Sequence, residues 1–231
     1  MAMSATAPTA PTLEEAWQIC ADLFSGFSAS PRNVGSVDSE HELLFCLLGG
    51  FGVSYEHNRS AVDVIAALEP FCSTHADDEL CDLLVGTLSQ PLFGPPRSDG
   101  SLRRYRFPRR KADLIVKART WLRLRRPLTD LLASVADERE RRRILCQCPG
   151  IGPKSASWML RNIGLAQELA ILDVHVVRAL AAAGRLAGAR LPRDYELVET
   201  AFLGWCRELN APPAGFDLFI WEWQRGSLLP A

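Results

Sequence analysis

The sequence predicts an all-α protein. Apolar residues recur at three- and four-residue spacing through most of the chain, no segment shows the alternation typical of a β-strand, and no internal repeat is present. The chain has 231 residues, of which 48% are hydrophobic and 23% charged. This composition is ordinary for a globular protein, and the length is sufficient to bury a sizeable core.

The first half of the chain predicts four helices followed by a loop. Residues 1–11 are small and Pro-rich and are expected to form a disordered leader, with a single domain of two helical lobes over 12–231. Apolar spacing predicts helices over 13–24, 41–51, 59–71 and 77–88, the second of which ends at a glycine pair. Residues 89–108 are rich in Gly, Pro and Arg and predict a long loop.

The second half predicts further helices around a central hairpin at 137–164. Helical spacing covers 109–124, 128–135, 137–148, 154–164, 173–184, 194–209 and 214–226. The stretch "LCQCPGIGPKSAS" (145–157) predicts helix, tight turn, helix. Pro149 is expected to end the first helix, Gly150 and Gly152 to permit a turn with positive φ, and Pro153 to begin the second helix.

The start of the second helix is a candidate phosphate site. Backbone N–H groups between Gly150 and Lys154 would have no acceptor inside the helix, and such an end attracts an anion, with or without a bridging monovalent cation. An ordinary corner between two helices remains the alternative on the Gly-x-Gly pattern alone.

Positive charge is concentrated in one segment. The formal net charge is −1, yet residues 97–126 carry twelve Lys or Arg against only Asp99 and Asp113, a local balance of +10. This segment suits contact with nucleic-acid phosphates, for which Arg109 and Arg110 are candidates. A solvated, salt-bridged surface is the other interpretation.

Lys154 is unusual because arginine is the common cation of this chain. Only Lys111, Lys117 and Lys154 contribute lysines to the Lys+Arg total of 26. A lysine amine can lose its proton and attack carbon, whereas a guanidinium stays protonated. Asp173 follows 19 residues later at the start of a predicted helix. A lysine and a carboxylate together suit attack on the anomeric carbon of a nucleotide, with a Schiff base as product.

The sequence resembles a known family at these positions. "LCQCPGIGPKSAS" followed by "ILDVHVVRAL" resembles the helix-hairpin-helix DNA glycosylase superfamily with its Gly-Pro-Asp signature. With "YRFPRRKADLIVKAR" and "FDLFIWEWQRG", it is similar to the short 8-oxoguanine DNA glycosylase/AP lyases of archaea and some bacteria, over most of residues 40–228. The resemblance implies a two-lobed helical fold that binds double-stranded DNA, flips a nucleotide out, removes a damaged purine and cleaves the strand.

The resemblance also implies roles for particular residues. Lys154 matches the Schiff-base nucleophile, Asp173 the catalytic carboxylate, and His175 a residue that touches the phosphate of the extruded nucleotide. Gly150 and Gly152 match the phosphate-binding hairpin. Candidates for the base pocket are Trp158, one helical turn after Lys154, with Asp217 and Trp221 in the tail segment. Core packing is the alternative for any single tryptophan.

The cysteines give no pattern of a metal or cluster site. No iron–sulfur cluster is expected, because only Cys206 follows Asp173. Cys146 and Cys148 alone are a poor metal motif. No cofactor is therefore expected apart from a monovalent cation that could bind at the hairpin. The seven cysteines predict reduced thiols in the cytoplasm, with no membrane span and a monomeric chain.

Two alternatives remain open. One is a catalytically silent DNA-binding or adaptor module, which would not need Lys154 and Asp173 at this spacing, since arginine binds phosphate as well. The other concerns biology: glycosylases resembling this one also occur as accessory components of bacterial anti-phage signalling operons.

Overall fold

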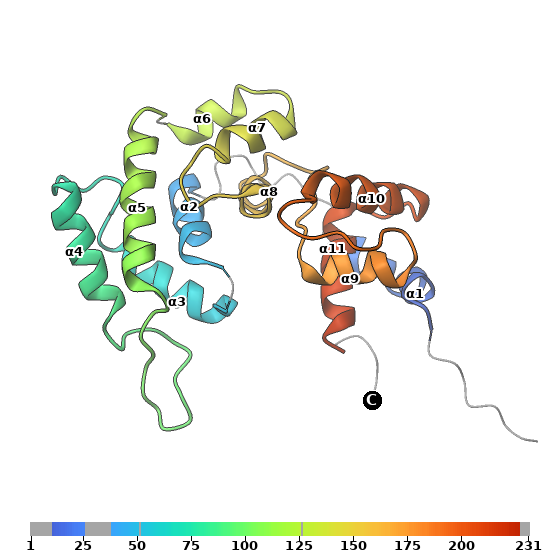
Figure 1. Cartoon of the computed structure of the whole chain (residues 1–231), viewed down its shortest axis with the longest axis horizontal. Helices are drawn as coiled ribbons and strands as arrows, with labels where there is room; N and C mark the ends of the chain where they lie inside the picture. The colour runs from blue at the N-terminus through green and yellow to red at the C-terminus, as the bar shows by residue number, and fades with distance from the viewer. Residues whose placement is uncertain (1–10, 26–37, 51, 126, 227–231) are drawn as a thin grey trace, which may run out of the picture. The chain divides into compact units, whose positions relative to one another are not determined.

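The fold is entirely helical over the part that the computed structural model describes, residues 11–25, 38–50, 52–125 and 127–226 (Figure 1). These residues form eleven helices, and the only β-type pairing among them is an isolated antiparallel bridge between Phe93 and Arg103. The all-α prediction is confirmed. The expected leader falls mostly outside the described residues. The chain divides into two compact units, unit 1 (1–30 and 170–231) and unit 2 (31–169).

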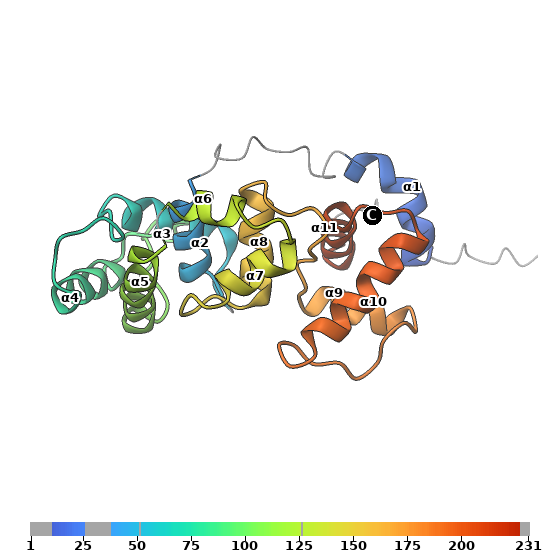
Figure 2. The same cartoon turned by 90° about the horizontal axis from the view of Figure 1, so that it is seen from above.

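Unit 2 contains seven helices around an apolar core. They are α2 (Ser39–Leu48), α3 (Tyr55–Ala66), α4 (Asp77–Leu88), α5 (Pro108–Arg123), α6 (Leu128–Ala133), α7 (Glu138–Leu145) and α8 (Pro153–Asn162). Helices α4 and α5 lie side by side, and α2 packs against α3, α5 and α8 (Figures 1 and 2). Leu43, Leu80, Ile115 and Met159 are fully buried in this core, to which α2, α4, α5 and α8 therefore all contribute.

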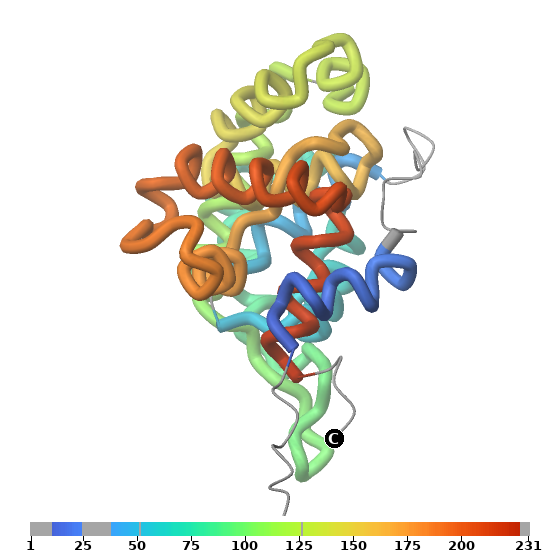
Figure 3. The backbone as a smooth tube through the Cα atoms, turned by 90° about the vertical axis from the view of Figure 1, so that its right-hand side faces the viewer, coloured from blue at the N-terminus to red at the C-terminus, as the bar shows by residue number. Residues whose placement is uncertain are grey.

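Unit 1 contains four helices from the two ends of the chain. They are α1 (Leu13–Ser25), α9 (Val174–Ala182), α10 (Tyr195–Glu208) and α11 (Pro213–Gln224). Helix α1 lies beside α11 (Figure 3). The ring of Trp17 meets Phe216 and Phe219 edge-on, at centroid distances of 5.1 and 5.3 Å. Aromatic packing between distant segments therefore closes this unit.

Some helix ends differ from the sequence prediction. Helix α2 begins after Asp38, whose carboxylate accepts from Glu40 N at 2.9 Å, and α3 begins after Ser54, whose hydroxyl caps it in the same way. The expectation that Pro149 ends the first hairpin helix is wrong. Helix α7 ends at Leu145, and the chain turns there because Cys148 N donates back to Leu145 O at 2.9 Å. Side-chain and backbone caps therefore decide these ends.

The C-terminal end of α2 is capped by a buried lysine. Lys111 of α5 is only 9% exposed, and its Nζ donates to Leu47 O at 2.8 Å and also to Gly49 O. Burial lowers the pKa of Lys111 to about 8. A neutral amine still has two N–H donors, so both carbonyls can be satisfied in either charge state.

Two further side chains complete this cap. The Tyr105 hydroxyl donates to Leu48 O at 2.7 Å, and the Asn58 amide Nδ2 donates to Phe45 O at 2.9 Å. Tyr105 precedes α5 and Asn58 belongs to α3, so three separate segments serve the last turn of α2. These hydrogen bonds hold the C-terminal end of α2 against α3 and α5.

We expect Lys111→Met to lower the free energy of unfolding by about 1–3 kcal/mol, because two buried carbonyls lose their donor. The unfolded chain binds the lysine proton up to about pH 10.4, above the folded pKa of about 8. The unfolding free energy of the wild type should therefore rise across this window, and that of the Met variant should not. Urea unfolding at about pH 7.5 and 9.5 measures both. A difference between the two proteins that does not change with pH would contradict the buried-amine assignment.

Candidate functional site

The hairpin between α7 and α8 requires glycine at its first position. Gly150 has φ +90°, and a Cβ there would lie 3.0 Å from Leu114 Cδ2 and 3.3 Å from Leu47 Cδ2. Ile151 is 5% exposed and anchors the turn in the core of unit 2. Gly150 is therefore needed both for its backbone conformation and for the close approach of two leucines.

Gly152 has a different role, and the expectation that it takes a positive φ is wrong. It is the N-cap of α8 with ordinary extended φ and ψ of −101° and 176°, and a Cβ there would meet no atom within 4 Å. No side chain caps this helix. The N–H groups of Gly152, Lys154 and Ser155 have no acceptor within the described part of the chain. The backbone N–H groups at the start of α8 are thus left without acceptors, an arrangement that favours binding of an anion.

Lys154 lies in the first turn of α8 and is exposed. Its amine forms no hydrogen bond or ion pair with any residue that the structure describes. The amine is therefore accessible to a ligand and is not committed to a structural contact. The structure places Gly150, Gly152 and Lys154 together on one hairpin, as the sequence predicts.

Trp158 follows Lys154 by one helical turn, but its ring packs inside unit 2. It stacks on Phe45 of α2 at a centroid distance of 6.2 Å and an interplanar angle of 14°. Its indole N–H is buried without a partner among the described residues. These contacts support the packing interpretation for Trp158, because the ring face toward Phe45 is already covered.

Asp173 is the N-cap of α9. Its Oδ1 accepts from the backbone N–H groups of His175 at 2.8 Å and Val176 at 3.2 Å. Its Oδ2 accepts no hydrogen bond from the described segments. One oxygen therefore holds the helix start and fixes the carboxylate, which leaves the other oxygen for chemistry.

His175 lies one residue further on and contacts a residue that the sequence analysis did not single out. Its Nδ1 lies 2.9 Å from Gln224 Oε1, and Gln224 Nε2 donates to the His175 carbonyl at 2.7 Å. Gln224 is the last residue of α11. No local sequence signal reveals this pair, because the partners are 49 residues apart.

The two tail candidates have different environments. Asp217 is 9% exposed, and its Oδ2 accepts from Ile171 N at 3.3 Å, so it ties α11 to the segment before Asp173. Trp221 is half-buried, with the Arg225 guanidinium 4.1 Å from its ring centroid. Phe219 and Trp223 pack in or against the apolar core of unit 1, whereas Trp221 does not. It is therefore the tail tryptophan best suited to stack on a ligand.

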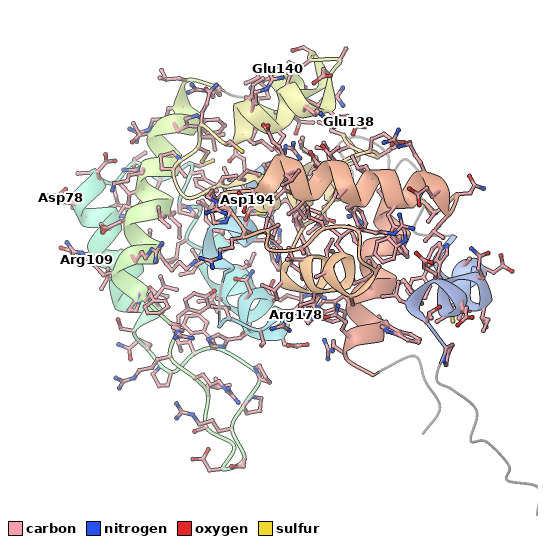
Figure 4. The ribbon with its side chains drawn as sticks, turned by 45° about the vertical axis from the view of Figure 1, so that its right-hand side comes forward. Asp78, Arg109, Glu138, Glu140, Arg178 and Asp194 are labelled. Carbon is pink, nitrogen blue, oxygen red and sulfur yellow. The ribbon has the colours of Figure 1, made fainter. Side chains whose placement is uncertain are left out.

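The arginines of the basic segment are not equivalent. Arg109 extends from α5 toward α4 (Figure 4), with ion pairs to Asp82 at 3.6 Å and Asp113 at 3.8 Å. Arg110 is exposed and has no ion pair within the described ranges. Arg119 is 1% exposed and holds the turn before α4. Arg110 is thus free for a phosphate, whereas Arg109 would have to share its charge.

Phe107 is a second residue that sequence reasoning missed. It is the N-cap of α5, 49% exposed, and holds a left-handed φ of +61°. The Arg106 guanidinium lies 4.7 Å from its ring centroid. A bulky residue in this conformation is strained, and such strain is concentrated at functional sites. Sequence alone does not reveal a positive φ outside glycine and asparagine.

The candidate residues are distributed over both units. Gly150, Gly152 and Lys154 belong to unit 2, whereas Asp173, His175, Asp217 and Trp221 belong to unit 1. In the part of the chain that the structure describes, no three His, Cys, Asp or Glu side chains are grouped as a metal site would require. The seven cysteines are all free thiols. None of the helices within the described ranges combines the length and apolar character that a bilayer span requires.

Comparison with known proteins identifies one group of enzymes. A family model described as 8-oxoguanine DNA glycosylase matches residues 98–211, which include the hairpin and Asp173 but not α11. The 8-oxoguanine DNA glycosylase/AP lyase of Metallosphaera sedula is 32% identical over 124 residues, and that of Korarchaeum cryptofilum is 32% identical over 131 residues. Each match covers 54% of this chain and 60% of the relative, so the chain matches less than two thirds of each relative's length.

Solved structures extend the similarity to nearly the whole chain. The 8-oxoguanine DNA glycosylase of Thermotoga maritima is 26% identical with a TM-score of 0.66, covering 94% of this chain and 96% of that one. The Methanocaldococcus jannaschii enzyme is 25% identical with a TM-score of 0.65, covering 94% of both chains. A complex of the latter with a 15mer DNA containing 8-oxoguanine shares the fold at 23% identity, with a TM-score of 0.69 over 94% of this chain and 99% of that one.

We expect the two hairpin glycines to respond differently to alanine. Gly150→Ala should lower the free energy of unfolding by about 1–3 kcal/mol, because the new Cβ meets two leucines at a positive φ. Gly152→Ala should cost less than about 1 kcal/mol, because its backbone is ordinary and its Cβ faces open space. Urea unfolding of both variants measures the difference. Equal losses would show that the hairpin conformation has been assigned incorrectly.

Proposed function

We propose that the chain is a helix-hairpin-helix DNA glycosylase, and that it acts as a bifunctional DNA glycosylase/AP lyase. Its substrate would be a damaged purine of the 8-oxoguanine type in double-stranded DNA. The observation that carries the proposal is Lys154, an exposed and unpaired amine in the first turn of the helix that follows the glycine hairpin. A module that only binds DNA would not need an amine here.

Lys154 would act as the nucleophile. Its unprotonated nitrogen forms a bond to C1′ of the flipped nucleotide as the C1′–N9 bond breaks, and the purine leaves with the bond electrons and takes up a proton. Loss of the amine protons and opening of the sugar give an imine. Removal of a C2′ proton then expels the 3′ phosphate by β-elimination, and water hydrolyses the imine to release the lysine.

Asp173 would stabilise the positive charge that develops on the sugar as the base leaves. Its Oδ1 is fixed by two backbone N–H groups, and this supports a carboxylate held ready before the reaction. Its second oxygen, which has no partner in the described structure, would face the sugar. The carboxylate cannot turn to another partner without uncapping α9, so its orientation is coupled to the fold.

DNA contacts would come from both units. The hairpin N–H groups at Gly152 and Lys154, Arg110 on α5 and His175 on α9 are the proposed phosphate contacts, with Arg109 contributing less because of its ion pairs. Phe107 presents an exposed ring beside Arg106, which suits stacking on a base.

The base pocket is proposed on the tail helix. Trp221 supplies a ring outside the core for stacking, and Asp217 supports the segment that leads into Asp173. Trp158 would contribute packing behind Lys154. The excised base, a monovalent cation at the hairpin, the absence of other cofactors, the monomeric state, the cytoplasmic location and a role in phage defence all stay predictions.

Borohydride trapping tests the proposed chemistry. On duplex oligonucleotides that carry 8-oxoguanine or an abasic site, borohydride should reduce the imine and leave a covalent protein–DNA complex. Lys154→Gln should lose this complex, at least about a hundredfold, because the amide cannot form an imine. Lys117→Gln, which removes an exposed lysine from α5, is the matched control and should trap like the wild type.

Each outcome of the trapping experiment has a distinct meaning. Trapping on both substrates that disappears in Lys154→Gln supports the nucleophile and the substrate class. Trapping at the abasic site alone supports the lyase chemistry and means that another base is the substrate. No trapping on either substrate favours the silent DNA-binding module.

The basic segment predicts a strong salt dependence of DNA binding. The slope of log K against log salt is negative. Replacing Arg104, Arg106 and Arg110 by Ala should make it shallower by about 2–3, because each lost phosphate contact removes about 0.9 from its magnitude. Removing Arg190, Arg193 and Arg207 gives the same charge change in unit 1 and should alter the slope less. Fluorescence anisotropy over a salt series measures both. An unchanged slope in the first variant would place the basic segment outside the interface.

A further inference from the structure

The imidazole of His175 and the amide of Gln224 form a two-point contact within unit 1. His175 Nδ1 lies 2.9 Å from Gln224 Oε1, and Gln224 Nε2 donates to the His175 carbonyl at 2.7 Å. His175 is the second residue of α9, Gln224 is the last residue of α11, and the two helices pack together. Both residues are half-buried, so the contact is partly shielded from water.

The hydrogen bond from Gln224 Nε2 to His175 O determines which atom donates in the contact between Gln224 Oε1 and His175 Nδ1. A backbone carbonyl only accepts hydrogen bonds, so the Gln224 amide must turn its nitrogen toward His175 O and its oxygen toward the ring. That amide oxygen also only accepts, so His175 Nδ1 must carry a proton. In the neutral ring the lone pair is then on Nε2, which has no hydrogen-bond partner among the described residues.

We propose that Gln224 is a positioning residue that holds His175 in its Nδ1-protonated form, so that the ring meets a DNA phosphate only as an imidazolium. A phosphate oxygen accepts hydrogen bonds, and Nε2 can donate one only when both ring nitrogens are protonated. This inference rests on the proposed function, in which His175 contacts the phosphate of the extruded nucleotide. Wherever the free ring is neutral, DNA binding then takes up one proton at this ring.

Other ionisable groups lie on the elements around the ring. Asp173 Oδ1 accepts from the His175 backbone N–H at 2.8 Å, and Arg178 lies on the same helix. Helix α9 packs against α10 and α11. The ionisable residues of these two helices and their caps are Asp194, Tyr195, Glu196, Glu199, Cys206, Arg207, Glu208, Asp217, Glu222 and Arg225. Gln224→Met leaves all of these groups in place and adds none, so its comparison with the wild type isolates the ring.

The first test measures the tautomer in the free protein. Two-dimensional proton–nitrogen spectra of the imidazoles, recorded above the titration range, should show the Nδ1–H form for His175 in the wild type. Gln224→Glu keeps an acceptor at Nδ1 and should retain this form. Gln224→Met removes the acceptor and should shift the ring toward the Nε2–H form, while the exposed His75 stays unchanged. An Nε2–H ring in the wild type would overturn the proposal.

The second test measures the consequence for DNA. Affinity for a duplex with a tetrahydrofuran abasic analogue, followed by anisotropy, should fall about tenfold for the wild type from the acidic to the alkaline end of a pH series, because only the doubly protonated ring can donate to the phosphate. The fall should be smaller for Gln224→Met, because its neutral Nε2–H ring can still donate. His175→Ala should lack this step. A merely structural role for Gln224 would weaken binding equally at every pH.

The two tests separate the inference from the function on which it rests. If the wild type shows no affinity for the duplex at any pH, the proposed function fails, and the tautomer spectra still decide whether Gln224 fixes the ring. If the duplex binds and Gln224→Met keeps the pH dependence of the wild type, the positioning role is wrong while the proposed function stands.

Discussion

The structure of unit 2 depends on hydrogen bonds to the last carbonyls of α2. A helix end that is buried must find donors outside the helix, because its final carbonyl groups have no partner within it. Lys111, Tyr105 and Asn58 supply these donors from three different segments. Helix α2 also packs against α3, α5 and α8. It therefore supports the start of α5, where Phe107 and Arg110 lie, and α8, whose first turn carries Lys154.

The positive residues of the chain serve two purposes that composition does not distinguish. Lys111 and Arg119 are buried and hold carbonyl groups, Arg109 is paired with carboxylates, and Arg110 remains without an ion pair within the described ranges. Part of the local balance of +10 therefore stabilises the fold. The charge that remains for the proposed contact with DNA is correspondingly smaller than the sequence count indicates.

The sequence is sufficient to predict features that are local. The hairpin could be predicted because Gly-x-Gly-Pro determines a turn and a helix start within a few residues, and Asp173 could be placed at a helix start for the same reason. Asp38 and Ser54 also carried local cap signals, and these would have corrected the starts of α2 and α3. The cap by Lys111 and the pairing of His175 with Gln224 join distant segments, so no local pattern reveals them. The roles of His175, Asp217 and Trp221 came only from family resemblance.

The order of the chain has a consequence for its synthesis. Unit 1 is assembled from residues on both sides of unit 2, and Trp17 of α1 packs on Phe216 and Phe219 of α11. During translation, α1 leaves the ribosome before unit 2 and must wait for the rest of its own core, while unit 2 can already fold as a continuous segment. At about 5–20 residues per second, that wait lasts on the order of ten seconds or more. Throughout it, the apolar face of α1 is exposed to chaperones, to proteases and to other nascent chains.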